Sequence, residues 1–144
     1  MAISGATSDK FTPTSVLAGK NISVKVQYTD ALGVKASSND CLSGGMFASE
    51  LHGYAGNDVL HGDSGDDTLY GGIGNDVLQG ADDNDRLSGD QGNDSLYGGV
   101  GNDSLYGGTG RDSLYGGNGA DLYYVDNAQD AVRDTGTDSL NDVL

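Results

Sequence analysis

Several residue types are scarce or absent in this chain of 144 residues. Cys41 is the only cysteine, so no disulfide can form within the chain and a disulfide-stapled scaffold is excluded. There is one proline and no tryptophan, and apolar residues make up only 35% of the chain, which is little for a globular core. Only seven Lys and Arg residues face 22 Asp and Glu residues, giving a net charge of −15. We expect so acidic a chain to repel nucleic acid and anionic membranes.

Long apolar stretches and catalytic motifs are absent as well. No apolar run is long enough to span a membrane, and the first residues lack the basic start and apolar stretch of a cleaved secretory signal. We therefore expect either export by a route without such a signal or a fragment excised from a longer protein, and we favour the fragment. There is no HExxH, no Gly-x-Ser-x-Gly and no partner set for Cys41, so we do not expect an enzyme.

Glycine, in contrast, is abundant, and it recurs in a strict nine-residue repeat. Eight units run without a gap from Gly53 to Tyr124 and approach the pattern Gly-Gly-x-Gly-x-Asp-x-Leu-x: the first position is Gly in all eight, the fourth is Gly in seven and the eighth is Leu in seven. Composition and charge alone would indicate disorder, but a leucine at every ninth position indicates a repeated structural unit. The sixth position is aspartate in all eight units: Asp58, Asp67, Asp76, Asp85, Asp94, Asp103, Asp112 and Asp121.

Each unit predicts a tight turn followed by a short strand. Glycine at the first, second and fourth positions permits positive φ, and such a turn is expected to point several backbone carbonyls inward. The last three residues alternate, as in Ser104-Leu105-Tyr106, with the leucine facing inward. If two units make one coil, each leucine lies about 4.7–4.9 Å from the one 18 residues later. The two sheets of this all-β parallel solenoid would then be lined by Leu60, Leu78, Leu96 and Leu114, and by Leu69, Leu87, Leu105 and Tyr123.

The same stacking arranges the aspartates in two columns, one along each edge. Without metal, neighbouring carboxylates within about 5 Å would cost roughly a kcal/mol or more per pair. A hard dication between them reverses the sign, and two carboxylates with turn carbonyls supply the six to eight oxygens that calcium prefers. Magnesium demands a stricter octahedron, and zinc would need His or Cys ligands. We predict six calcium sites, at Asp58/Asp76, Asp76/Asp94, Asp94/Asp112, Asp67/Asp85, Asp85/Asp103 and Asp103/Asp121.

The remaining ligands are expected to be backbone carbonyls of the glycine-rich turns. Six dications bring +12, close to the net charge of −11 that 13 aspartates, Arg86 and Arg111 give residues 53–124. The expected carbonyls lie near Gly53, Gly56, Gly62, Gly65, Gly71, Gly72, Gly74, Gly89, Gly92, Gly98, Gly99, Gly101, Gly107, Gly108, Gly110, Gly116, Gly117 and Gly119.

The units GGIGNDVLQ (71–79) and GGVGNDSLY (98–106) resemble the consensus of the repeats-in-toxin (RTX) family. The resemblance is strong over 53–124 and weaker over 44–52, where GGMFASELH keeps Leu51 but has Ser49 in place of aspartate. It implies a right-handed parallel β-roll that is disordered without calcium and folded with it. It also implies that the sixth-position aspartates and turn carbonyls are ligands, and that the protein is secreted or on the bacterial surface after type I secretion.

The chain divides into three parts by these criteria. Residues 1–43 form an N-terminal β segment with an alternating strand at 22–28, which either caps the first coil or is the remnant of an immunoglobulin- or cadherin-like repeat. Residues 44–124 form the roll, and the resemblance implies that 125–144 cap its end. Ala81 and Asp83 stand where glycine is usual, so the sites that use Asp85 depart most from the family pattern; because aspartate tolerates positive φ better than most residues, we expect the turn to form. Tyr123 at a core position is expected to close the roll.

The favoured function is a calcium-responsive folding module, not itself an enzyme, within a larger secreted or surface protein.

 It would act with calcium ions, the rest of the parent protein and a type I secretion channel, as a monomer without a membrane span. One alternative is an adhesive or glycan-binding module that uses outward tyrosine ladders, Tyr97 with Tyr115 and Tyr106 with Tyr124. Plain cross-strand packing is the favoured interpretation of those ladders. Another alternative is the non-catalytic C-terminal part of a secreted enzyme.

Overall fold

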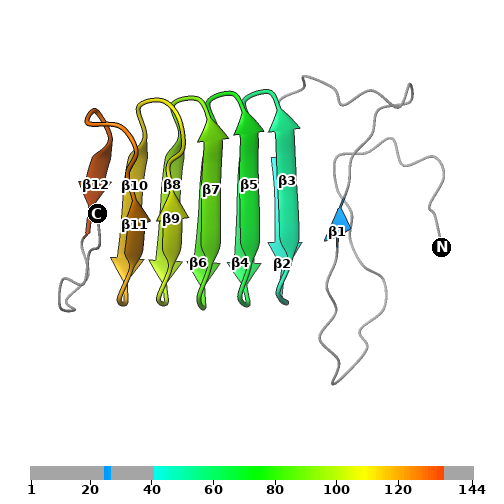
Figure 1. Ribbon diagram of the computed structural model, residues 1–144. Helices are drawn as coiled ribbons and strands as arrows, with labels where there is room; N and C mark the ends of the chain where they lie inside the picture. Colours follow the sequence, from blue (N-terminus) through cyan, green and yellow to red (C-terminus); the bar gives the residue numbers. More distant parts are fainter. Residues whose placement is uncertain (1–24, 27–40, 135–144) are drawn as a thin grey trace, which may run out of the picture.

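The computed structural model describes residues 25–26 and 41–134, and all regular structure within them is β-strand. The strands form two six-stranded parallel sheets, one of odd-numbered and one of even-numbered strands (Figure 1). The described strands are β1 (Lys25–Val26), β2 (Cys41–Gly45), β3 (Glu50–Ala55), β4 (Val59–Ser64), β5 (Thr68–Ile73), β6 (Val77–Asp82), β7 (Arg86–Gln91), β8 (Ser95–Val100), β9 (Ser104–Tyr106), β10 (Ser113–Asn118), β11 (Leu122–Tyr124) and β12 (Ala131–Arg133).

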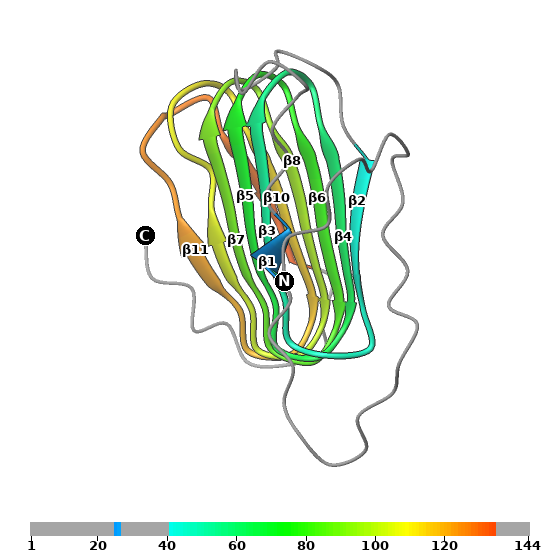
Figure 2. The same ribbon diagram turned by 90° about the vertical axis from the view of Figure 1, so that its right-hand side faces the viewer.

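The chain alternates between the two sheets and completes one coil every 18 residues. From β2 to β12, each strand pairs with the strand two places later, with Leu60 opposite Leu78 and Leu69 opposite Leu87. Seen along the stack, the coils lie one behind another, with the two sheets facing each other (Figure 2). The predicted all-β parallel solenoid with two nonapeptides per coil is therefore confirmed.

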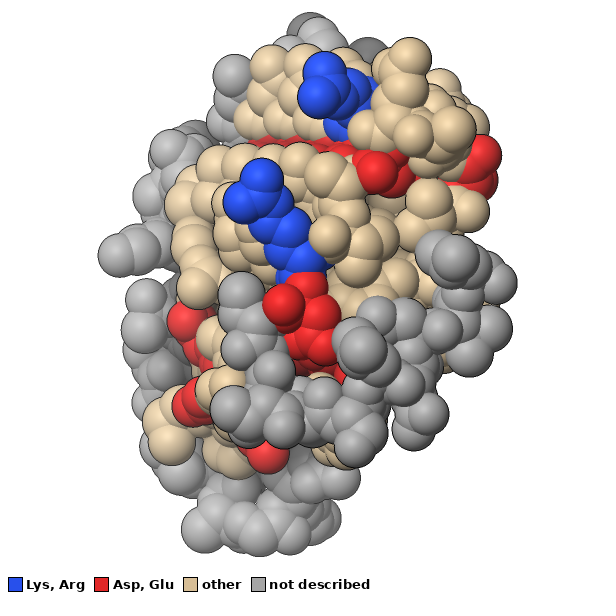
Figure 3. Space-filling view, turned by 90° about the vertical axis from the view of Figure 1, so that its left-hand side faces the viewer, with Lys and Arg blue, Asp and Glu red and all other residues tan. Residues whose placement is uncertain are grey.

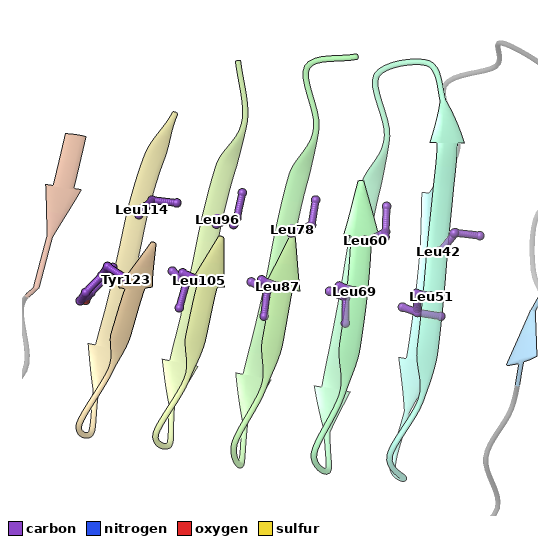
Figure 4. Packing of buried hydrophobic residues seen from close by; sticks show 10 residues of the cluster. All are labelled: Leu42, Leu51, Leu60, Leu69, Leu78, Leu87, Leu96, Leu105, Leu114 and Tyr123. Atoms are coloured by element: carbon purple, nitrogen blue, oxygen red, sulfur yellow. The ribbon is translucent and has the colours of Figure 1, made fainter. Parts of the chain in front are cut away.

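A single column of leucines in each sheet forms the core. These side chains point into the space between the sheets (Figure 4), and most of them are fully buried. Burying one leucine contributes about 1.5–3 kcal/mol, so the core is thin but regular. It contains the eight predicted residues together with Leu42 and Leu51, which extend the two columns by one coil towards the N-terminus.

Most strands are longer than the three residues expected from the repeat. β4 continues from Leu60 through Gly62 into the next unit, and both of these residues face inward. The first glycine of a unit is thus an inward strand position. Positive φ occurs instead at the second and fourth positions, as at Gly72 (110°) and Gly74 (140°). The expectation of positive φ at the first position is wrong, and the reason for glycine there lies in the site described below.

The roll is bordered by strands outside the regular repeats. β1 pairs with β3, placing Lys25 opposite Glu50; the rest of the strand predicted at 22–28 lies outside the described residues. At the other end, β11 with Tyr123 is the last strand of its sheet, but the facing sheet continues to β12, which pairs with β10. The 18-residue register therefore extends past the last regular unit to Arg133. Capping roles for the two flanks remain predictions.

Replacing Leu87 by Ala is expected to lower the free energy of unfolding in calcium by about 2–5 kcal/mol, because a fully buried leucine has no neighbour that can fill the cavity. Ile73→Ala is the matched control, since Ile73 is 58% exposed, and its effect should stay within about 0.5 kcal/mol. Denaturant titration in calcium measures both. Equal losses in the two variants would contradict the leucine-column core.

Candidate metal centre

The eight sixth-position aspartates form two columns of buried carboxylates, as predicted. Each of them directly precedes a strand, so the parallel register places it next to its counterpart 18 residues away. All eight are between 1% and 5% exposed. Buried carboxylates are costly unless each is paired with a cation or satisfied by hydrogen bonds, so the surroundings of the two oxygens decide what the columns do.

Of the eight carboxylates, the seven from Asp67 to Asp121 each accept a hydrogen bond from the neighbouring coil at one oxygen. The Asp94 Oδ1 accepts the backbone N–H of Asp76 at 2.7 Å, and the Asp112 Oδ1 accepts that of Asp94 at 2.8 Å. The same bond recurs along both columns. Among the described residues, the first of the series runs from the Ser49 N–H to Asp67 Oδ1, and the last runs from the Asp112 N–H to Asp130 Oδ1. Each carboxylate is therefore held rigidly between two coils.

The second oxygen is buried without a hydrogen bond. This holds for the Oδ2 atoms of six aspartates within the described part of the chain: Asp67, Asp76, Asp85, Asp94, Asp103 and Asp112. Each Oδ2 faces the first glycine of its own unit. A Cβ at Gly89, for example, would lie 2.5 Å from Asp94 Oδ2. The first position is thus glycine because a side chain would displace this oxygen.

Backbone carbonyls from both coils face the same gap. The Cβ position at Gly89 also lies 2.6 Å from the carbonyl oxygen of Gly107, one coil later. From the opposite side, the carbonyl of Gly74 points at Gly92, and that of Gly92 points at Gly110. The carbonyls of the fourth positions thus point along the stack rather than towards the centre of their own coil, as the sequence had led us to expect. Each gap between coils is lined by hard oxygen donors alone.

The irregular unit 80–88 keeps this geometry. Ala81 and Asp83 adopt positive φ (92° and 78°) like the glycines they replace, and the Asp83 carbonyl still points at Gly101. Asp85 is buried and accepts the N–H of Asp67 at 2.8 Å. The backbone around Asp85 therefore keeps the geometry of the regular units, as expected from the tolerance of aspartate for positive φ.

The arrangement fits a hard cation bound by few side chains and several carbonyls. Among residues 25–26 and 41–134, no three His, Cys, Asp or Glu side chains gather as a metal-binding group. His52 and His61 lie on different sheets, on β3 and β4, so they offer no paired nitrogen ligands. Seen from the β12 end, acidic side chains form a recessed band between two ridges (Figure 3). An oxygen-only gap of this kind suits calcium and not zinc.

Comparison with known proteins agrees with this chemistry. The model of the RTX calcium-binding nonapeptide repeat family matches four overlapping segments, 43–78, 70–105, 79–114 and 97–132, which together cover more than half of the chain. The chain belongs to this family. No curated protein and no solved structure matches it. Within the described residues, no helix is present that could cross a membrane.

The RTX register also includes an aspartate that sequence reasoning missed. Asp130 lies 18 residues after Asp112 and accepts its N–H at 2.9 Å, so it continues the first column. Residues 125–133, VDNAQDAVR, form a ninth unit with Asp130 at the sixth position and Val132 opposite Leu114. The spacing of 18 from Asp112 was the available signal, but the unit has no glycine and does not read as a repeat.

Burial controls the ionisation of the RTX carboxylates. The pKa of Asp85 and of Asp94 is raised to about 7. Burial is the main cause and nearby carboxylates of the same column add to it, whereas a backbone N–H bond to each carboxylate opposes the shift. For the same reason burial raises the pKa of Asp67 and of Asp103 to about 6. Without a cation, these groups hold protons in the folded state that they would release when unfolded near neutral pH.

Acidification is therefore expected to favour folding of the RTX roll in the absence of calcium. Because the folded pKa values lie above the unfolded value of about 3.9, the folded state binds more protons between pH 4 and 7, and its stability falls as the pH rises through that window. Circular dichroism in chelator should show more β-structure at pH 5 than at pH 8. A strand signal that decreases on acidification would contradict the assignment.

Two substitutions that exchange the same residue types should have opposite effects. Gly89→Ala places a methyl group against Asp94 Oδ2 and the Gly107 carbonyl, and it is expected to destabilise the folded form by about 1–3 kcal/mol. Ala81→Gly relieves a φ of 92° and is expected to stabilise it by about 1 kcal/mol. Denaturant titration in calcium compares the two variants. A loss of stability in both variants would contradict the assignment of a steric requirement to the first position and a positive-φ requirement to the second.

Proposed function

We propose that the chain is a calcium-dependent folding module that supports the export, extracellular folding and stability of a larger protein. The observation that carries this proposal is the row of buried Oδ2 atoms without hydrogen-bond partners, five of which lie beside a carbonyl of the next coil: those of Asp67, Asp76, Asp85, Asp94 and Asp103. Folding brings these oxygens out of water, and only a cation or a proton can compensate them. The folded state is therefore linked to calcium by its own construction.

The proposed ligands are the eight sixth-position aspartates and the turn carbonyls, in six interior gaps. An interior gap lies between two coils that both carry a sixth-position aspartate of the regular repeats, such as Asp76 and Asp94. In each of the six gaps, the carbonyl of a first-position glycine points at the first-position glycine one coil earlier. The glycines that these carbonyls face are Gly53, Gly62, Gly71, Gly80, Gly89 and Gly98. Bound calcium supplies positive charge between the coils. The chain's part is to fix the carboxylates by the Oδ1 bonds and to keep side chains out of the gap.

Mass action turns this linkage into a switch. Calcium that binds only the folded chain stabilises it by an amount that grows with the free calcium concentration. At the low calcium concentration of a cytoplasm, the acidic columns keep the chain unfolded, which suits passage through a type I secretion channel. At the higher calcium concentration outside the cell, the roll forms. The module itself needs no catalytic residue, and its parent protein carries the activity that is exported.

Adhesion through the tyrosines has weaker support. The predicted ladders are present, with ring centroids 4.8 Å apart for Tyr97 and Tyr115 and 4.0 Å for Tyr106 and Tyr124. The rings are nearly parallel, so each pair covers one face of each partner, and Arg86 lies 4.1 Å from the centroid of the Tyr106 ring. These contacts stabilise the outer face of a sheet, and Tyr97 and Tyr124 keep 40% and 43% of their surface exposed.

Circular dichroism at pH 7.5 with calcium and with chelator tests the proposal. Calcium should convert a largely disordered chain into one rich in β-structure, and Asp94→Asn should raise the calcium midpoint, because Asp94 faces two interior gaps. Asp90→Asn is the matched control, since Asp90 is exposed and asparagine tolerates its positive φ of 72°. It should leave the midpoint nearly unchanged. Full β-structure in excess chelator at this pH would refute the proposal.

A further inference from the structure

Among the described residues, two gaps lie at the ends of the aspartate columns, and both differ from the six interior gaps in the same way. The N-terminal end gap lies between the turns 44–49 and 62–67, and the C-terminal end gap lies between the turns 107–112 and 125–130. In interior gaps, the fourth-position carbonyl points at the next coil, as Gly74 points at Gly92, and the Oδ2 atoms of aspartates such as Asp94 have no hydrogen bond.

At the C-terminal end gap, hydrogen-bond donors occupy the carboxylate of the last coil and the fourth-position carbonyl, whereas Asp112 Oδ2 has no hydrogen bond, as in the interior. Asp130 keeps the interior bond from the Asp112 N–H, but its Oδ2 also accepts the backbone N–H of Asn127 at 3.1 Å. The side-chain amide of Asn127 donates to the carbonyl of Gly110, the fourth-position carbonyl of this gap. The three atoms nearest to the Cβ position at Gly107 all belong to Asp112, so no carbonyl of the following coil lies closer than 3.2 Å to that position.

At the N-terminal end gap, a hydroxyl takes the same part. Ser49 stands at the sixth position, and its N–H bonds to Asp67 Oδ1 at 2.6 Å as in the interior. Its Oγ donates to the carbonyl of Phe47 at 2.7 Å, which is again the fourth-position carbonyl. Near Gly65 the closest atoms are Ala48 N and Phe47 C, so this carbonyl is turned away from the next coil.

A donor hydrogen on a carbonyl oxygen opposes a cation at that oxygen, because both are positive and need the same lone pairs. Each end gap also lacks one of the oxygens that the interior gaps share: a carboxylate at Ser49, and a carbonyl beside Gly107. We propose that both end gaps close by hydrogen bonds without metal, so that Ser49 and Asn127 take the place of calcium at the two ends. This inference rests on the proposed function and fixes where calcium binding stops.

Calcium stoichiometry, measured by isothermal titration calorimetry on the full chain, tests the inference. Asp130→Asn should keep the wild-type stoichiometry, because asparagine Oδ1 still accepts the Asp112 N–H and no ion is lost. Asp94→Asn is the matched control and should reduce the stoichiometry, since Asp94 faces two interior gaps. Asn127→Asp replaces the donor amide with a carboxylate and should add one ion per chain.

The outcomes separate this inference from the proposed function. A loss of one ion in Asp130→Asn, or no added ion in Asn127→Asp, would overturn the metal-free end gaps while calcium-dependent folding remained. Calcium-induced circular dichroism of each variant shows that it still folds. If the wild-type chain bound no calcium at all, the proposed function itself would be wrong.

Discussion

The structure depends on one bond, from the backbone N–H of a sixth-position residue to the Oδ1 of the aspartate one coil later. It links successive coils outside the two sheets, at the turns, where strand pairing has ended. It also fixes the rotation of the carboxylate, so that Oδ2 cannot turn to water and stays beside a glycine inside the coil. The bond that orders the stack therefore creates the charge that a cation must neutralise, and folding and metal binding become a single process.

The nonapeptide divides its tasks among positions, and the strictness of each position follows from its physics. The first position is glycine in all eight regular units, because any Cβ would collide with the carboxylate and a carbonyl. The second position needs only positive φ, which costs other residues about 1–2 kcal/mol. That cost is tolerated at Tyr54, Asp63, Ala81 and Asp90. A steric collision leaves no such latitude. The eighth position needs apolar volume, and Tyr123 meets that need at the last coil of its sheet.

Much of this arrangement could be predicted from the period alone. A parallel stack with a coil of 18 residues fixes which leucines and which aspartates are neighbours, and no knowledge of the turn is required. The role of the first glycine could not be predicted, because sequence does not distinguish a glycine needed for φ from one needed for space. Asp130 and Asn127 were missed because the ninth unit has lost its glycines: its register depends on pairing with β10, and only the structure shows that pairing. Leu42 was missed for the same reason, since its unit precedes the recognisable repeats.

The ends show why a calcium roll needs a different chemistry where its repeats stop. In a solenoid each coil contacts only its neighbours, so an ion between two coils acts as a nearest-neighbour contact. An interior coil such as 71–88 has a gap on each side, and each of its two aspartates is held by a bond to the next coil. Among the described residues, the turns 44–49 and 125–130 each have a neighbouring turn on one side only, so an ion at either place would depend on a turn held from one side. Donors within the terminal turns themselves, the Ser49 hydroxyl and the Asn127 amide, satisfy the carbonyls without that dependence. The length of the calcium-binding section is thus set by where the donors begin.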